Sequence, residues 1–161
     1  MNETTVAGGS AEHEALVDQL RAFPAEVARA IEGVPEEALK RPGSDGGWGV
    51  AEVLGHLRDW EEVFRDRIRA IRSEDRPALP AYDDALWEIE HDYGAQTPQS
   101  ALNSFEAVRS ETVGLLADLT PQEWEQVGIH SSHGPITIRW IAEYLRGHDA
   151  DHLRQIREAL G

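Results

Sequence analysis

Helical periodicity is the feature of this sequence that most restricts its fold. Four long segments carry apolar residues at spacings of three and four, as an amphipathic helix does, and no segment shows the sustained alternation of a strand. The segments run from about Ala11 to Glu32, from about Val50 to Arg72, from Thr97-Pro98 to about Leu119, and from about Thr137 to the end of the chain. Two helical hairpins packed together would bury all four apolar stripes. The sequence therefore predicts an all-α four-helix bundle.

The connectors indicate how these helices are ordered. The first and third connectors have roughly 16 residues each, whereas the second, from Ser73 to Gln96, has about 25, enough to carry the chain across a bundle. The second and third helices therefore need not be antiparallel neighbours. A short extra helix is expected between Asp84 and Tyr93 in this long connector. With 161 residues, the chain is expected to form one domain over residues 11–161, preceded by a flexible tail over residues 1–10.

Charge and composition exclude several classes of function. The chain has 15 Lys and Arg against 30 Asp and Glu, a formal net charge of -15, which argues against nucleic-acid partners and anionic membrane surfaces. Without cysteine it has no disulfide, no thiolate ligand and no cysteine nucleophile. No apolar run approaches the roughly 20 residues of a membrane span, and residues 1–10 lack the features of a signal peptide. We expect a cytoplasmic protein that acts on a small molecule.

Two histidines in the fourth segment carry the first indication of chemistry. His148 and His152 are four positions apart, so they project from one face of the helix. They continue the apolar stripe that includes Leu145 and Ile156, so they occupy positions where core residues belong. Burying two imidazoles costs free energy unless each finds a partner, and a shared metal ion would satisfy both.

The second segment supplies a third histidine. His56 lies in line with Val53 and Trp60, and so it also faces inward. Three imidazoles from two helices would bind a divalent ion on one side and leave a position open, which is typical of a catalytic site. The alternative is that each is a hydrogen-bonded core histidine that binds nothing. Gln155 and Asp59 lie one turn beyond His152 and His56, and each is either an orienting partner of a ligand or a polar residue at the rim.

Other histidines offer weaker candidates. His130 and His133 flank a Ser-Ser loop, either at the mouth of a site or, as we expect, in solvent. Glu88-x-x-His91 has the spacing of half a di-iron motif, but the chain holds no second copy. His13 continues the stripe of the first segment without a histidine four positions away, so we expect a core or surface residue.

Two stretches resemble signatures of the DinB/YfiT-like superfamily. Residues 48–59, WGVAEVLGHLRD, resemble its Trp-Ser-x-x-Glu…His-Leu-x-Asp signature, and residues 147–156, GHDADHLRQI, resemble its His-Asp-x-x-His-Leu-x-Gln-Ile signature. The resemblance implies a four-helix bundle of up-down-down-up topology over nearly the whole chain, and a metal triad at His56, His148 and His152. The usual Ser is Gly49 here, which suggests a capping box without its hydroxyl, at a cost of a few tenths of a kcal/mol.

The resemblance also implies a function. Family members include S-transferases that use the small thiols bacillithiol or mycothiol, and others named as metal-dependent hydrolases. We expect the S-transferase, with the hydrolase as an alternative in which the ion activates water and Asp59 is the candidate base. A non-catalytic metal- or small-molecule-binding stress protein is the third possibility. Imidazole ligands suit zinc, nickel and iron alike. A homodimer is expected, as the commonest assembly and one that family members often form.

Overall fold

The computed structural model describes residues 3–161, apart from the side chains of residues 3–10, 84 and 85. The helices are α1 (Glu3–Ile31), α2 (Glu36–Leu39), α3 (Val50–Ser73), α4 (Asp84–His91), α5 (Pro98–Ala117) and α6 (Ile138–Leu160), with a 3-10 turn, η1 (Glu123–Glu125). The strands are β1 (Ala78–Leu79), β2 (Val127–His130) and β3 (Gly134–Thr137). The four predicted long helices correspond to α1, α3, α5 and α6, and the short helix expected in the second connector is α4.

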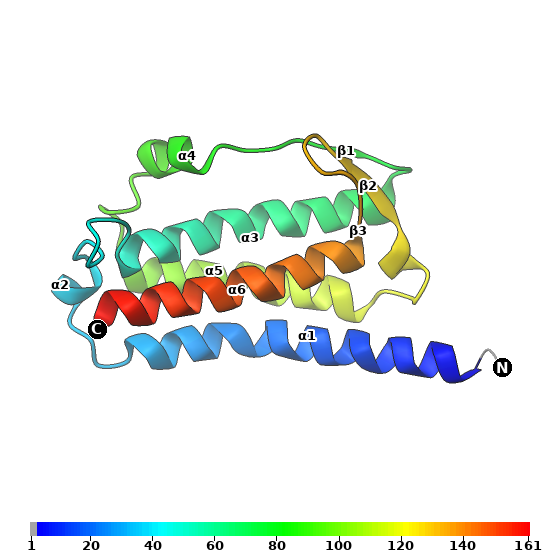
Figure 1. Ribbon diagram of the computed structural model, residues 1–161, viewed down its shortest axis with the longest axis horizontal. Helices are drawn as coiled ribbons and strands as arrows, with labels where there is room; N and C mark the ends of the chain where they lie inside the picture. Colours follow the sequence, from blue (N-terminus) through cyan, green and yellow to red (C-terminus); the bar gives the residue numbers. More distant parts are fainter. Residues whose placement is uncertain (1–2) are drawn as a thin grey trace.

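The four long helices form an up-down-down-up bundle. α1 packs against α5 and α6, and α3 packs against the same two helices, so α1 and α3 lie on opposite corners. In Figure 1, α1 and α6 run in one direction along the bundle, and α3 and α5 run in the other. The expected topology is confirmed, and α3 and α5 are parallel neighbours. The predicted flexibility of residues 1–10 stays a prediction: residues 1 and 2 lie outside the described residues, and residues 3–10 continue α1.

The parallel pair α3 and α5 forces the chain to return along the bundle. After α3 the second connector forms β1, runs back over α3 and carries α4 to the opposite end (Figure 1). β1 pairs in parallel with β2, and β2 pairs antiparallel with β3, which fixes the start of the connector beside the segment that enters α6. These strands were not predicted, because two to four residues are too few to show alternation.

Two of the long helices begin where the sequence predicts. Thr97 precedes Pro98 at the first position of α5, where a proline costs no hydrogen bond. Thr137 caps α6 through its side-chain oxygen, which accepts a 3.0 Å hydrogen bond from the backbone nitrogen of Trp140. This cap fixes the start of the helix that carries His148 and His152.

Gly49 at the start of α3 is required for a different reason from the one expected. Its backbone nitrogen donates to Glu52 Oε2 at 3.1 Å, so one half of the capping box is present. A Cβ atom at this position would lie 1.8 Å from the carbonyl oxygen of Arg41. The expectation that glycine here means only a missing hydroxyl is therefore wrong: glycine lets the preceding loop pack directly on the helix start.

Replacing Gly49 by serine is therefore expected to destabilise the fold despite the restored hydroxyl. Overpacking of this kind costs about 1–3 kcal/mol. Gly114→Ala is the control, because Gly114 lies exposed within α5 with no atom near its would-be Cβ, and it should stabilise by about 0.5–1 kcal/mol. Urea unfolding of both variants tests this, and a G49S protein as stable as wild type would contradict the close approach.

One buried ion cluster connects all four long helices. Arg109 of α5 is 1 % exposed. It forms two hydrogen bonds with Glu61 of α3, at 2.7 and 3.0 Å, and two with Asp149 of α6, both at 2.8 Å. Its remaining N–H donates to the carbonyl oxygen of Leu20 of α1 at 2.9 Å. All five donors of the guanidinium are thus satisfied, each at a defined place in the bundle. Burial raises the pKa of Asp149 to about 6, although Arg109 opposes this shift.

Replacing Arg109 by methionine is expected to cost about 3–5 kcal/mol, because it leaves two carboxylates buried without a counter-charge. Arg139→Met is the matched control, since Arg139 makes the same two-point contact with Glu125 at 2.7 and 2.9 Å but is exposed. That variant should lose less than about 1 kcal/mol. Urea unfolding again provides the measurement, and equal losses in the two variants would show that the buried cluster has no special role.

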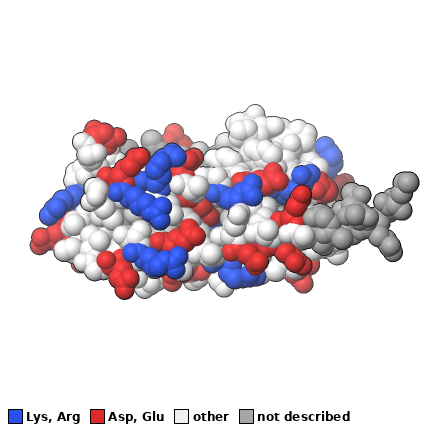
Figure 2. All heavy atoms as spheres, turned by 60° about the horizontal axis from the view of Figure 1, so that its bottom comes forward, with Lys and Arg blue, Asp and Glu red and all other residues white. Residues whose placement is uncertain are grey.

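The surface carries both acidic and basic side chains. On the face shown in Figure 2, acidic and basic side chains lie beside one another rather than in separate patches. Exposed pairs such as Arg154 with Asp151 on α6 contribute to this mixture. No helix in the described part of the chain is long and apolar enough to cross a membrane.

Candidate metal centre

Three histidines from two antiparallel helices converge in the bundle. His148 Nε2 of α6 lies 3.1 Å from His56 Nε2 of α3 and 3.1 Å from His152 Nε2 of α6. One ligand atom from each of the three lies within 4.8 Å of the other two. Nitrogens that share one ion at about 2.1 Å lie roughly 3.0–3.4 Å apart in octahedral or tetrahedral arrangements. The triad thus has the spacing of a metal site, as the sequence predicts.

Burial keeps two histidines of the triad neutral, as metal ligation requires. Burial, with His152 nearby, lowers the pKa of His56 to about 3. Burial, with His152 and His56 nearby, lowers the pKa of His148 to about 2. Both rings therefore lack a positive charge at pH 7 and present lone pairs. Three nitrogens that face one another cannot all be paired by hydrogen bonds among themselves, because each has only one proton or one lone pair to offer. A cation between them would accept a lone pair from each. The residues present therefore fit a divalent ion.

Of the two roles left open for Gln155, its contact favours that of an orienting partner of His152. Its Oε1 lies 2.9 Å from His152 Nδ1, so it accepts the Nδ1 proton and leaves the Nε2 lone pair facing the other two histidines. His56 has no such support, because its Nδ1 is buried without a hydrogen-bond partner among the described residues. Its ring instead lies 5.0 Å from the ring of Trp48.

Asp59 faces away from the triad. Its Oδ2 accepts from Tyr93 Oη and His91 Nδ1, each at 2.6 Å, and its Oδ1 accepts from Arg58 Nε at 2.9 Å. These hydrogen bonds outweigh burial and lower the pKa of Asp59. The carboxylate lines a neighbouring cavity with His91 rather than the cavity of the triad. Its contacts therefore give no support to the expected role of catalytic base, and they fix α4 to α3.

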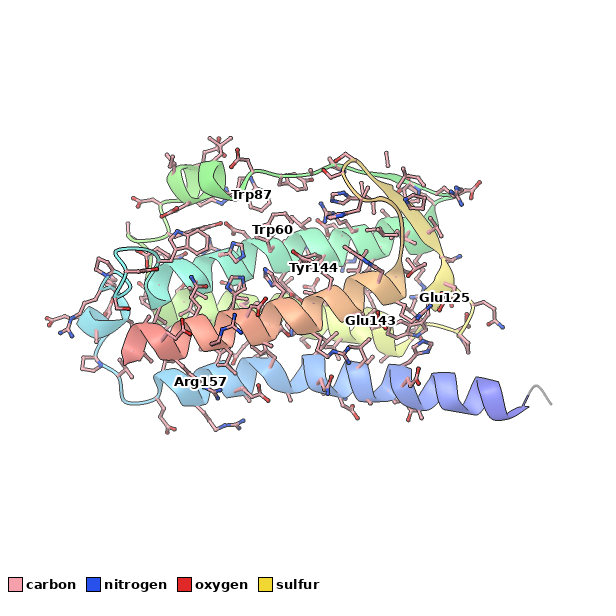
Figure 3. The ribbon with its side chains drawn as sticks, viewed as in Figure 1. Trp60, Trp87, Glu125, Glu143, Tyr144 and Arg157 are labelled. Atoms are coloured by element: carbon pink, nitrogen blue, oxygen red, sulfur yellow. The ribbon has the colours of Figure 1, made fainter. Side chains whose placement is uncertain are left out.

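The triad lies at one end of a cavity of about 410 Å³ between α3, α6, the second connector and the β2–β3 hairpin. Each helix contributes one row of side chains, and the rows are His56, Trp60, Phe64 and Arg67 on α3, and His152, His148, Tyr144 and Trp140 on α6. Figure 3 shows Trp60 and Tyr144 on the two helices, with Trp87 reaching from α4 toward Trp60, 5.6 Å away between ring centres. The cavity joins a metal-binding end to an aromatic middle.

Other histidines lie apart from the triad. His130 and His133 both line the far end of the same cavity. The expectation of a solvated loop is wrong for His130, which is buried at the end of β2, whereas His133 is exposed in the turn that follows. His91 holds Asp59, and His13 stacks on Trp124 at the opposite side of the bundle, 4.2 Å between ring centres. Within the residues that the structure describes, no second group of histidines and carboxylates has the spacing of a metal site.

The fold and the sequence match known proteins over almost the whole chain. YfiT from Bacillus subtilis, described as a probable metal-dependent hydrolase with an unusual four-helix bundle topology, superposes with a TM-score of 0.85 and 26% identity, over 91% of this chain and 85% of that one. The family model of the DinB superfamily matches residues 19–156. The chain belongs to the DinB superfamily.

Several curated relatives of this DinB protein share one designation. A protein of Oceanobacillus iheyensis named "Putative metal-dependent hydrolase" is 23% identical over 142 residues, which is 88% of this chain and 82% of the relative. The YfiT sequence of Bacillus subtilis, with the same designation, is 27% identical over 143 residues, which is 88% of this chain and 80% of the relative. The names agree with a metal site in this superfamily and assign hydrolysis to these relatives.

Removing the oxygen that orients His152 is expected to weaken metal binding. Gln155→Leu should lower the affinity for zinc about 10–100-fold, because His152 loses the acceptor that fixes its tautomer and ring. Arg154→Leu is the control, since Arg154 directly precedes Gln155 on α6 and its side chain is exposed. Competition with a chromogenic zinc chelator measures both. Equal affinities in Q155L and wild type would show that Gln155 does not support a ligand.

Proposed function

We propose that this protein is a metal-dependent enzyme in which His56, His148 and His152 hold a divalent ion and the adjoining cavity binds a small-molecule substrate. The convergence of three imidazole Nε2 atoms at the wall of that cavity carries the proposal. A structural zinc site usually has four protein ligands, whereas three ligands leave a position for substrate. Zinc, nickel and iron all suit such a ligand set.

The reaction we propose is the transfer of a small thiol. A divalent ion in this site would supply a Lewis acid that lowers the pKa of a group bound to it. A thiol ionises near about 8.5 and water near about 15.7, so the thiol needs less help to become a nucleophile. Among the described residues that line the cavity, there is no carboxylate that could take a proton from water. The lining therefore favours a nucleophile that ionises readily.

The thiol would come from a co-substrate, because the chain has no cysteine. Its sulfur forms a bond to an electrophilic carbon, the leaving group departs with the bonding electron pair, and the thiol proton passes to solvent. Bacillithiol or mycothiol would serve as the co-substrate. The aromatic side chains of Trp60, Phe64 and Tyr144 line the middle of the cavity and offer an apolar surface to the electrophilic substrate.

A hydrolase is the second candidate, and the printed names of the relatives favour it. It would use the same three histidines. Water would replace the thiol as the nucleophile. The proton of this water would pass to a histidine or to solvent.

Conjugation of thiols to 1-chloro-2,4-dinitrobenzene, with and without added zinc or nickel, tests the transferase. We expect metal-dependent product formation with bacillithiol or mycothiol. His148→Gln should abolish it together with stoichiometric metal binding, because the central nitrogen of the triad is lost. His13→Gln is the matched control, since it also removes one histidine, far from the cavity, and it should keep full activity.

The outcomes separate the candidates. Cleavage of 4-nitrophenyl acetate that depends on metal and His148, without conjugation of any thiol, would show the hydrolase instead. Stoichiometric metal without either reaction would support the binding protein. Wild-type protein purified without an affinity tag that takes up less than about a tenth of an equivalent of metal would overturn the metal site itself.

A further inference from the structure

Arg67 is a buried guanidinium without a counter-charge. It lies on α3 with 8 % of its surface exposed. Nη2 donates to the carbonyl oxygen of Pro80 at 2.6 Å, and the buried Nε has no hydrogen-bond partner among the described residues. Within the described part of the chain, no carboxylate oxygen lies within 4.0 Å of it, in contrast to Arg109, whose five donors are all taken. A buried cation with free donors lacks the anion that would offset its desolvation.

The surroundings of Arg67 stabilise its charge but do not use its donors. The guanidinium carbon lies 5.7 Å from the ring centre of Trp60 and 5.9 Å from that of Tyr82, within the range of cation–π attraction. Aromatic faces accept no strong hydrogen bond, so these contacts hold the side chain in place and leave its N–H groups for another molecule.

His130 lies beside Arg67 at the same end of the cavity. Burial, with the charge of Arg67 nearby, lowers the pKa of His130, so the ring is neutral at pH 7. Its Nδ1 accepts from the backbone nitrogens of Ser132 and His133 at 3.0 and 3.1 Å. The ring proton therefore resides on Nε2, which makes His130 a second donor.

The charge of the cavity matches an anion. The chain holds 30 Asp and Glu, yet none of those whose side chains the structure describes lines this cavity. Arg67 also borders the neighbouring cavity, which is lined by Asp59, Glu62 and Asp66 and would repel an anion. Asp59 and Asp66 already pair with other arginines, so neither neutralises Arg67.

The helix spacing sets the distance between the two ends of the cavity. Arg67 follows His56 by eleven positions, which is about three turns or roughly 16 Å along the axis, so both project from the same face of α3. Trp60, Phe64 and Tyr144 lie between them, and Tyr144 is 46% exposed, so the cavity opens to solvent there.

We propose that Arg67 and His130 form an anion-binding subsite that holds the carboxylate or phosphate group of an elongated substrate with an apolar middle. The reacting end of that substrate then lies toward the three histidines; this part rests on the proposed function, whereas anion binding at Arg67 does not. A guanidinium recognises both oxyanions through paired hydrogen bonds, and a neutral amide of the same shape cannot replace them.

Metal-free protein is the sample that tests this subsite apart from the metal site. Tryptophan fluorescence is titrated with 3-phenylpropionate, 2-phenylethyl phosphate and the neutral 3-phenylpropanamide. We expect at least one anion to bind about tenfold or more tightly than the amide, and the tighter of the two identifies the anionic group. Equal binding of the amide and both anions to metal-free wild type would overturn the proposal, whatever the enzyme assays show.

Two variants assign the preference to a residue. Arg67→Gln should reduce the preference for anions to within about twofold while the amide binds as before. Arg69→Gln is the matched control, because Arg69 lies two positions on, half-exposed and paired with Glu111, and it should keep the full preference. A preference that survives in folded R67Q, as judged by circular dichroism, would also overturn the proposal. If R67Q does not fold, the comparison of amide and anions in wild type and R69Q still decides whether the subsite exists.

Discussion

The fold depends on one buried cation. Arg109 projects from α5 and reaches a carboxylate on α3, a carboxylate on α6 and a backbone carbonyl on α1, so its five hydrogen bonds specify how the four long helices meet. Asp149 directly follows His148, and Glu61 lies five positions after His56. The contact that aligns α3 with α6 therefore also sets the distance between the histidines that the two helices contribute. A purely apolar core would permit small shifts along the helix axes, but a two-point ion pair on each side does not.

The molecule separates two electrostatic environments. The chain carries a net charge of -15, whereas the cavity holds three histidines at one end and, at the other, an arginine without a carboxylate partner. Acidic side chains are either mixed with arginines on the surface, as on the face in Figure 2, or tied to arginines inside the bundle. The cavity is thus positive relative to its surroundings without any excess of basic residues in the sequence.

Sequence patterns predicted what repeats along a helix and missed what depends on packing between segments. His56, His148, His152 and Gln155 follow helical spacing, so their common direction is visible in the sequence. In the sequence, Arg67 and Arg109 look like ordinary surface arginines. The connector that buries Arg67 contacts it 13 positions later, at Pro80. The two carboxylates that pair with Arg109 are 40 and 48 positions away. Asp59 has helical spacing from His56, yet Tyr93 and His91 in the connector draw it to the other side. The strands beside the cavity are too short to show a pattern.

The return of the second connector has a consequence for divergence among proteins of this fold. Because α3 and α5 are parallel, some segment must cross the bundle. Here that segment supplies Ala81 and Tyr82 to the cavity, while every histidine of the triad lies on α3 or α6. Loop segments tolerate insertion and substitution far better than packed helices. Changes in length or composition of this crossing segment would reshape the cavity and leave the triad untouched. Selection can therefore alter which molecules the cavity admits without rebuilding the three-histidine centre.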